Sequence, residues 1–235
     1  GADTPTLENI KFTAKPGEIT AFIGSTGSGK STLINLIPRF YDIQQGQILV
    51  DGIDVRDYKQ KDLRSKIGYV PQRGILFSGT VESNIKYGNP DASNEEMINA
   101  AEVAQAAGFI NEFPEKYQNH ISQGGTNVSG GQRQRLSIAR ALLIHPEIYI
   151  FDDSFSALDY KTDALLRAAL YKEIKKYNST AIIVAARIST IRNAHQIIVL
   201  DEGKIVGKGT HSELMKNCEV YKEIALSQLS GEELE

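Results

Sequence analysis

Short apolar runs alternate along the chain with stretches whose apolar residues recur at helical spacing. Most of the apolar runs are bounded by glycine or proline, as strands often are, and they cover residues 18–23, 47–50, 67–70, 148–151, 181–185 and 196–200. Helical stretches include residues 30–37, which end at Pro38, and the tail from Ser212 onward. This alternation is typical of an α/β domain with a largely parallel sheet.

The middle third of the chain is predominantly helical in pattern. Within residues 94–107 the apolar residues recur at helical spacing, namely Met97, Ala100, Ala101 and Ala104. We therefore expect an α/β core made of residues 1–79 and 146–235. An all-helical subdomain, residues 80–145, is expected to interrupt that core.

The last third returns to strand-like runs before its helical tail. Residues 201–203, Asp-Glu-Gly, separate two such runs and are expected to form a hairpin turn. The acidic end, residues 231–235, is expected to be solvated or frayed. No internal repeat or low-complexity segment interrupts the pattern, so the chain is interpreted as one large domain with an insertion.

Composition narrows the class of protein further. The net charge of -3 argues against a nucleic-acid partner, since such proteins usually present a basic face. The single cysteine, Cys218, cannot form a disulfide within the chain and fits a reducing cytosol. No apolar stretch reaches the ~20 residues that a membrane span requires. If the protein serves a membrane, we expect another segment or chain to cross it.

A glycine-rich segment follows the first strand-like run and precedes a helix. Glycines there allow backbone N–H groups to wrap around phosphates, and the start of the helix directs its positive dipole at them. Lys30 is expected to neutralise the β- and γ-phosphates, and the Ser31 hydroxyl to ligate Mg²⁺. The segment fits the P-loop pattern G-x-x-x-x-G-K-[ST] in full, so the predicted nucleotide-binding residues are Gly24, Ser25, Thr26, Gly27, Ser28, Gly29, Lys30, Ser31 and Thr32.

Two acids, Asp152 and Asp153, follow the apolar run at residues 148–151. In open α/β sheets, ligands bind at the carboxyl ends of the strands, where Asp152 is expected to lie. With a P-loop upstream, Asp152 is predicted to hold Mg²⁺ through its waters. Taken alone, the segment could also be a surface turn after a buried strand.

A second glycine-rich helix start lies well downstream of the P-loop. Ser129 is a natural N-cap, and Gly130 and Gly131 leave bare backbone N–H groups that suit an anion. One ATP needs only one P-loop, so this second helix start is expected to serve the nucleotide of a partner. A glycine-rich helix start without a ligand is the alternative.

Residues 127–135 resemble the signature motif of ABC ATPases, in which each domain of a head-to-tail dimer caps the other's ATP. On that resemblance, Ser129, Gly130, Gly131 and Gln132 contact the partner's ATP. Asp159 contacts it as well, from residues 156–159, which match the family's D-loop. Gln72 matches the Q-loop glutamine that contacts both Mg²⁺ and the attacking water. Residues 77–85 resemble the exporter form of the helical subdomain.

The resemblance covers essentially the whole chain and has consequences for fold and partners. It implies a P-loop NTPase (RecA-like) α/β core, with ATP and Mg²⁺ as cofactors and with Ser31, Gln72 and Asp152 at the metal. It also implies two partners, a second ABC nucleotide-binding domain and a transmembrane domain outside this chain. The expected location is the cytoplasmic face of a cell membrane.

Three positions depart from the family pattern. The catalytic base is normally Glu but is Asp153 here, and the switch histidine is replaced by Ala186. The aromatic residue that stacks on adenine is expected ahead of this sequence, because residues 1–6 contain no Tyr, Phe or Trp.

The first two departures concern hydrolysis. An Asp carboxylate falls about 1.5 Å short of where Glu would reach, and a general base must come within about 2.6–3.2 Å of its water. Ala186 offers no polar atom to the γ-phosphate. We therefore predict a degenerate ATP site in this chain, as in one half of many heterodimeric exporters.

Two other interpretations stay open. Mutagenesis often leaves alanine behind, so the chain could be an engineered, disabled domain of a homodimeric exporter. It could also be the ATPase head of a DNA-repair or chromosome-maintenance protein. Such heads carry a very long coiled coil between P-loop and signature, and no sustained heptads occur in that interval here.

Overall fold

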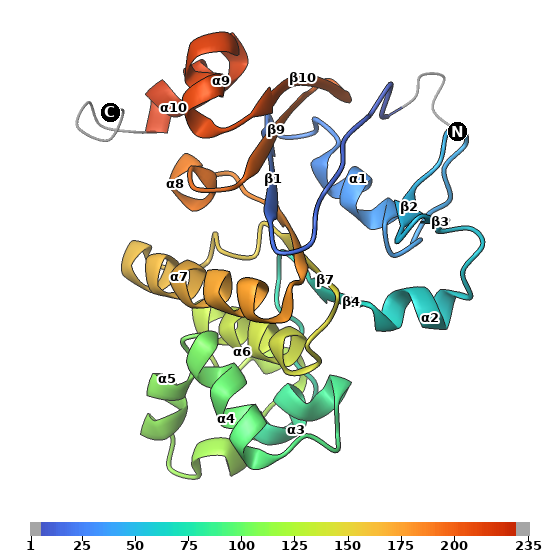
Figure 1. Cartoon of the computed structure of the whole chain (residues 1–235). Helices are drawn as coiled ribbons and strands as arrows, with labels where there is room; N and C mark the ends of the chain where they lie inside the picture. The colour runs from blue at the N-terminus through green and yellow to red at the C-terminus, as the bar shows by residue number, and fades with distance from the viewer. Residues whose placement is uncertain (1–5, 229–235) are drawn as a thin grey trace.

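A six-stranded sheet forms the centre of the computed structural model, which describes residues 6–228 (Figure 1). The strand order is β10-β9-β1-β8-β7-β4, and all neighbours are parallel except β9 and β10. The bounds are β1 Ile19–Gly24, β4 Ile67–Val70, β7 Ile148–Asp152, β8 Thr180–Val184, β9 Gln196–Asp201 and β10 Lys204–Gly209. The largely parallel sheet that the apolar runs predict is confirmed. The prediction for residues 231–235 lies outside the described residues.

The central strands are almost continuously apolar because helices cover both faces of the sheet. On one face, Phe22 packs in a cluster with residues of α1 (Lys30–Leu36) and α2 (Gln60–Ser65). On the other face, the neighbouring Ala21 and Ile23 belong to a cluster with α7 (Tyr160–Tyr177). In Figure 1, α1 and α7 accordingly lie on opposite sides of the sheet. The hydrophobic pattern does not single out α7, although it is the longest helix described.

The structure confirms the predicted hairpin turn and places one predicted strand outside the main sheet. The hairpin at residues 201–203 joins β9 to β10, and Glu202 and Gly203 both adopt positive φ, as a tight two-residue turn requires. The run at 47–50 forms only a two-residue strand, β2 (Leu49–Val50). It pairs with β3 (Ile53–Asp54) in a separate small sheet.

The C-terminal segment adds three helices to the sheet. They are α8 (Ile188–Ile191), α9 (His211–Asn217) and α10 (Glu219–Gln228). The fully buried Tyr221 of α10 belongs to the same cluster as α7. The helical tail predicted from Ser212 onward is therefore confirmed within the described residues.

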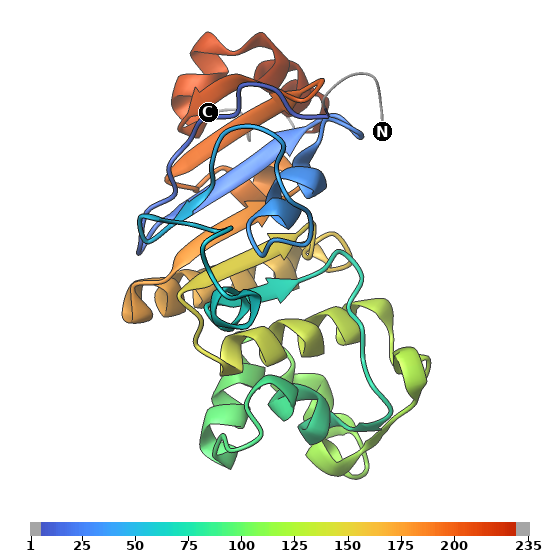
Figure 2. The ribbon, with the colours of Figure 1, turned by 90° about the vertical axis from the view of Figure 1, so that its right-hand side faces the viewer.

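The middle of the chain is helical, as predicted, and lies beyond the β4 edge of the sheet (Figure 2). Its helices are α3 (Val81–Ile85), α4 (Asn94–Val103), α5 (Ala107–Glu112) and α6 (Gly130–Leu143). A two-stranded sheet of β5 (Gly79–Thr80) and β6 (His120–Ile121) joins them. The helix expected over residues 94–107 ends earlier, at Val103, because Gln105 adopts a left-handed conformation with φ 58°.

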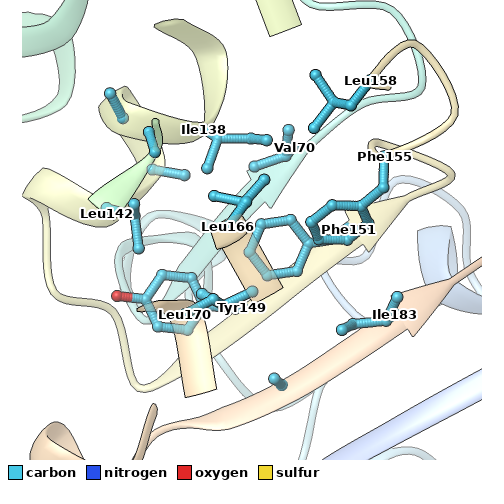
Figure 3. Close-up of a cluster of buried hydrophobic side chains, with 14 of the residues drawn as sticks. Val70, Ile138, Leu142, Tyr149, Phe151, Phe155, Leu158, Leu166, Leu170 and Ile183 are labelled. Carbon is cyan, nitrogen blue, oxygen red and sulfur yellow. The ribbon is translucent and has the colours of Figure 1, made fainter. Parts of the chain in front are cut away.

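The helical part shares its hydrophobic core with the sheet. Ile138 and Leu142 of α6 pack beside Leu166 and Leu170 of α7, over aromatic residues of β7 (Figure 3). The same cluster reaches Met97 of α4. One continuous hydrophobic core therefore joins the helical part to the sheet. The division into a core of residues 1–79 and 146–235 and a subdomain of residues 80–145 stays a prediction. Among residues 6–228, no helix is long and apolar enough to cross a bilayer.

Candidate functional site

The P-loop segment makes the turn from β1 into α1 in a conformation that requires glycine. Gly24 has φ 154°, and a Cβ atom there would lie 1.9 Å from the Leu200 carbonyl oxygen. Gly29, with φ 97°, is the N-cap of α1, and a Cβ atom there would lie 2.7 Å from the Leu7 side chain. Only glycine fits both positions, so the backbone can curl tightly enough to present N–H groups to a phosphate.

Lys30 lies within this loop. Its Nζ donates to the carbonyl oxygens of Gly24 and Ser25, at 2.8 and 2.7 Å, and to Ser28 Oγ at 3.2 Å. Burial lowers the pKa of Lys30, and the nearby carboxylates of Asp153 and Asp152 oppose that shift. The ammonium group is therefore held over the loop where phosphate charge is expected. The predicted P-loop residues Thr26, Gly27 and Thr32 are exposed.

Two of the three residues predicted to lie at Mg²⁺, Ser31 and Asp152, are in direct contact, whereas the third, Gln72, is hydrogen-bonded to Asp153. Ser31 Oγ donates to Asp152 Oδ1 at 2.9 Å, although the residues are 121 positions apart. Burial raises the pKa of Asp152, and hydrogen bonds from Ser31 and Tyr69 oppose that shift. Within residues 6–228 no cluster of three His, Cys, Asp or Glu side chains could hold a metal alone. The pair nevertheless fits Mg²⁺, which one or two protein oxygens usually hold together with substrate phosphates and water.

Tyr69 and Asn35 lie beside the Ser31–Asp152 pair, and the sequence analysis did not predict them. The Tyr69 hydroxyl lies 3.4 Å from Asp152 Oδ2 and donates to Asn35 Oδ1 at 2.9 Å. Burial is the main cause that raises the pKa of Tyr69, so the phenol stays protonated and acts as a donor. The sequence did hold a signal for Asn35, because it lies four residues after Ser31 and so shares its face of α1.

Gln72 and Asp153 also meet. Gln72 Nε2 donates to Asp153 Oδ2 at 3.2 Å, so the predicted Q-loop glutamine reaches the predicted base. Asp153 has φ 46°, a left-handed conformation that Asp tolerates better than most residues, and its N–H donates to the Val184 carbonyl at 2.9 Å. These contacts place Gln72 and Asp153 at the carboxyl edge of the sheet.

Ala186 lies two residues beyond β8 at the same edge, and its side chain is only a methyl group. The backbone around it is well held. The Gln228 side chain donates to the Ala186 carbonyl at 2.9 Å and accepts from the Ile188 N–H at 2.9 Å. Gln228 is a further residue that the sequence pattern did not reveal.

The predicted signature residues form the N-terminus of α6. Ser129 Oγ accepts from the Gln132 N–H at 3.2 Å, and Gln132 Oε1 accepts from the Ser129 N–H at 2.9 Å. This capping box leaves the amides of Gly130 and Gly131 as the first-turn donors for a ligand. A Cβ atom at Gly130 would point into open space.

The predicted D-loop, residues 156–159, lies next to the signature. A Cβ atom at Gly131 would come within 3.3 Å of the Ala157 carbonyl oxygen. Asp159 is the exposed N-cap of α7 and accepts from the Thr162 N–H at 2.9 Å and its hydroxyl at 2.7 Å. These hydrogen bonds lower the pKa of Asp159. The structure thus brings the residues predicted to act on a partner together, in a group separate from Lys30 and Ser31.

Buried Gln134 connects the signature helix to the Q-loop, defined here as residues 71–74. It is 1% exposed, and its side chain accepts from the Gly74 N–H at 2.7 Å and donates to the Pro71 carbonyl at 3.0 Å. A pocket of about 330 Å³ lies beside it, lined by Gln72, Arg73, Gly74, Gly124, Gly130, Arg133, Gln134 and Ala157. Gln72 and the signature glycine Gly130 therefore border the same pocket.

Comparison with protein families gives a match to the ABC transporter family over residues 7–156. An uncharacterized ABC transporter ATP-binding protein of Mycobacterium tuberculosis is 53% identical over 97% of the chain. An ATP-dependent lipid A-core flippase of Syntrophus aciditrophicus is 48% identical, and a putative multidrug export ATP-binding/permease protein of Staphylococcus aureus is 45% identical, each over 94% of the chain. The chain spans only 39%, 36% and 38% of these relatives.

Among solved structures, a bacterial Atm1-family ABC exporter with ATP bound superposes with a TM-score of 0.93 at 36% identity. The match covers 98% of this chain and 40% of that exporter. The similarity therefore extends over the helical part and the sheet alike.

Proposed function

The chain belongs to the ABC transporter family, and on that premise we propose that it is the nucleotide-binding domain of an exporter. Its P-loop binds ATP, and its helical part transmits the resulting motion to a transmembrane domain. Ser31 and Asp152 are the residues that would hold Mg²⁺, which neutralises phosphate charge when bound. In the rival ATPase-head interpretation, a long coiled coil would separate P-loop and signature. The described helices in that interval have at most 10 residues.

The ATP site that this chain itself forms is proposed to be degenerate. Binding groups are present there, because Lys30 lies in the loop and Ser31 meets Asp152. Hydrolysis needs two further groups at the same edge. The base position carries the short carboxylate of Asp153, which Gln72 engages, and Ala186 offers only its methyl group. This contrast between complete binding groups and reduced hydrolysis groups is the observation that carries the proposal.

The signature end is proposed to complete the ATP site of a second nucleotide-binding domain, on a different chain. Ser129 and Gln132 already satisfy each other, which leaves the two glycine amides free to bind phosphate. Dimerisation head to tail would bring these amides to the partner's P-loop. Hydrolysis in the pair would then take place mainly at the site that the partner holds.

An aromatic surface on the helical part is the proposed contact with the transmembrane domain. Phe77 and Tyr87 stack with their ring centroids 4.5 Å apart and are 43% and 61% exposed. Arg140 lies over both rings and donates to the Asn84 carbonyl, so the pair is anchored to α6. Exposed aromatic side chains on a rigid base are typical of binding surfaces. The protein would then act at the cytoplasmic face of a cell membrane.

Phosphate release by the full-length protein, alone and mixed with its partner chain, tests the proposal. We expect slow release from the protein alone and fast release from the mixture. If the protein alone turned over ATP as fast as the mixture, the degenerate site would be refuted. An active homodimer would then be the correct interpretation.

A further inference from the structure

We propose that Arg187 is a positioning residue that fixes the D-loop, residues 156–159, for the ATP site held by the partner. The proposal rests on the head-to-tail dimer proposed above. It assigns a role to the residue directly after Ala186, at the point where the switch side chain is lost.

Arg187 lies in the switch segment, defined here as residues 186–188, and its side chain contacts both ends of the D-loop. Its Nη2 donates to the carbonyl oxygen of Phe155, directly before the loop, at 2.6 Å. Its Nη1 donates to the carbonyl oxygen of Leu158, within the loop, at 3.5 Å. A planar guanidinium can hold two carbonyls in a fixed relation, which a lysine ammonium group cannot.

A buried carboxylate fixes the orientation of this guanidinium. Asp163 of α7 is 1% exposed and lies 3.6 Å from Arg187 Nη2. Asp163 also pairs with Arg167 at 3.0 Å and accepts from Thr190 Oγ1 at 3.3 Å. From the solvent side, the ring of Tyr160 covers the Arg187 guanidinium at 5.3 Å. Asp163 and Tyr160 therefore hold the Arg187 guanidinium in one orientation, which favours persistent hydrogen bonds to the D-loop carbonyls.

The backbone that carries Arg187 is anchored as well. Gln228 of α10 bonds to the Ala186 carbonyl and to the Ile188 N–H, the groups on either side of Arg187. The switch segment is thus hydrogen-bonded to α10 on one side and to the D-loop on the other. Its connection to the D-loop passes through the side chain of Arg187 and needs no side chain at position 186.

The D-loop in turn touches the residues that face the partner. The Ala157 carbonyl lies against Gly131 of the signature, and Asp159 is exposed at the end of the loop. Loosening the D-loop should therefore disturb the partner's site, where we place hydrolysis. It should not disturb ATP binding by Lys30 and Ser31, whose hydrogen bonds among residues 6–228 do not involve the D-loop.

The test compares Arg187→Lys with Arg167→Lys in the full-length protein paired with its partner. Both variants weaken an ion pair to Asp163, but only Arg187 also holds the D-loop carbonyls. We expect Arg187→Lys to lower kcat for phosphate release about tenfold, because small misplacements near the chemistry are costly. The affinity of the unmixed chain for Mg-ATP, measured by calorimetry, should stay unchanged. Arg167→Lys should leave both quantities unchanged.

Exposed Tyr160 supplies a variant that spares the core if Arg187→Lys does not fold. Tyr160→Leu removes only the ring over the guanidinium, and kcat should fall about twofold to fivefold. Equal losses of kcat in Arg187→Lys and Arg167→Lys, in parallel with their melting temperatures, would show a purely structural role. If Ser129→Arg stopped turnover while Arg187→Lys and Tyr160→Leu did not change it, this inference would fail and the proposed function would stand. If none of these variants affected turnover, the dimer proposal itself would fail.

Discussion

The binding end and the hydrolysis end of this chain's own ATP site differ in how completely they are built. At the binding end, Lys30 makes three hydrogen bonds within its loop, and Ser31 is bonded to Asp152. At the hydrolysis end, Asp153 receives one side-chain hydrogen bond, from Gln72, and Ala186 is held only through its backbone. The two ends lie at one edge of one sheet, so they share a scaffold. The fold and the binding loop are therefore intact although Asp153 and Ala186 stand at the two positions where hydrolysis groups are expected.

The largest expected effect comes from the signature, which is proposed to serve the partner's site and whose capping box is complete. Ser129→Arg places bulk and charge where, in the proposed dimer, the partner's γ-phosphate docks. Phosphate release from the full-length pair should fall roughly 10²-fold, as when a donor to a developing negative charge is lost. Binding of Mg-ATP by this chain alone should be unaffected.

Ser93→Arg is the matched control for that variant. Ser93 is also the N-cap of a helix with a capping box, but that helix is α4 and Ser93 is not among the predicted site residues. Both variants lose a cap, so both should show a similar fall in melting temperature. A comparable loss of phosphate release in Ser93→Arg would mean that the signature effect is only a folding effect.

Lys30→Ala is expected to act on the binding end. Removing a charged donor to phosphate should weaken Mg-ATP binding about 10- to 100-fold in a calorimetric titration. Lys172→Ala, at an exposed position of α7, is the control and should bind normally. Equal affinity in Lys30→Ala and the unchanged chain would contradict the P-loop assignment.

Restoring the family residues at the hydrolysis end should restore phosphate release at this chain's own site. In a Ser129→Arg background the partner's site is silent, so any turnover reports on the site of this chain. Adding Asp153→Glu and Ala186→His together should raise phosphate release about tenfold or more, since a well-placed base contributes at least that much. Asp153→Glu alone should recover little, because the γ-phosphate still lacks its switch contact. A full recovery by the single change would show that Ala186 is not limiting.

The smallest effect is expected for Asp153→Asn in the otherwise unchanged pair. If the carboxylate is already ineffective as a base, neutralising it should change phosphate release by less than about twofold. The amide can still pair with Gln72, so the contact between them is retained. Loss of turnover as complete as in Ser129→Arg would mean that this chain's site is catalytic.

Sequence patterns predicted the parts of this molecule that depend on local chemistry. The P-loop, the hairpin at 201–203 and the capped start of α6 each follow from the conformational preferences of a few adjacent residues. The meeting of Ser31 and Asp152 followed from a topological rule, since both lie at the carboxyl ends of parallel strands. None of these predictions needed knowledge of distant side-chain packing.

The predictions that failed or were missing depend on contacts between distant segments. Gln134 bonds to a loop 63 residues earlier, and Gln228 to a segment 42 residues earlier, and neither contact has a local sequence signal. The early end of α4 is an exception, since it depends on the local left-handed conformation of one residue, Gln105, and not on a distant contact. Side-chain to backbone hydrogen bonds of this kind become visible only when the fold is known.

Gln134 also has a thermodynamic consequence. Because Gln134 gives both its donor and its acceptor to the Q-loop, residues 71–74 are hydrogen-bonded directly to the first turns of α6, and we expect the two segments to move together. In the proposed dimer, a shift of Gln72 in response to ATP on this chain would therefore displace Ser129, which is proposed to face the ATP of the partner. Such coupling is reciprocal by necessity, so the factor by which one nucleotide strengthens the binding of the other must be the same in both directions. If this chain's site is degenerate as proposed, it would thus still regulate the pair, because its occupancy would set the affinity of the other site.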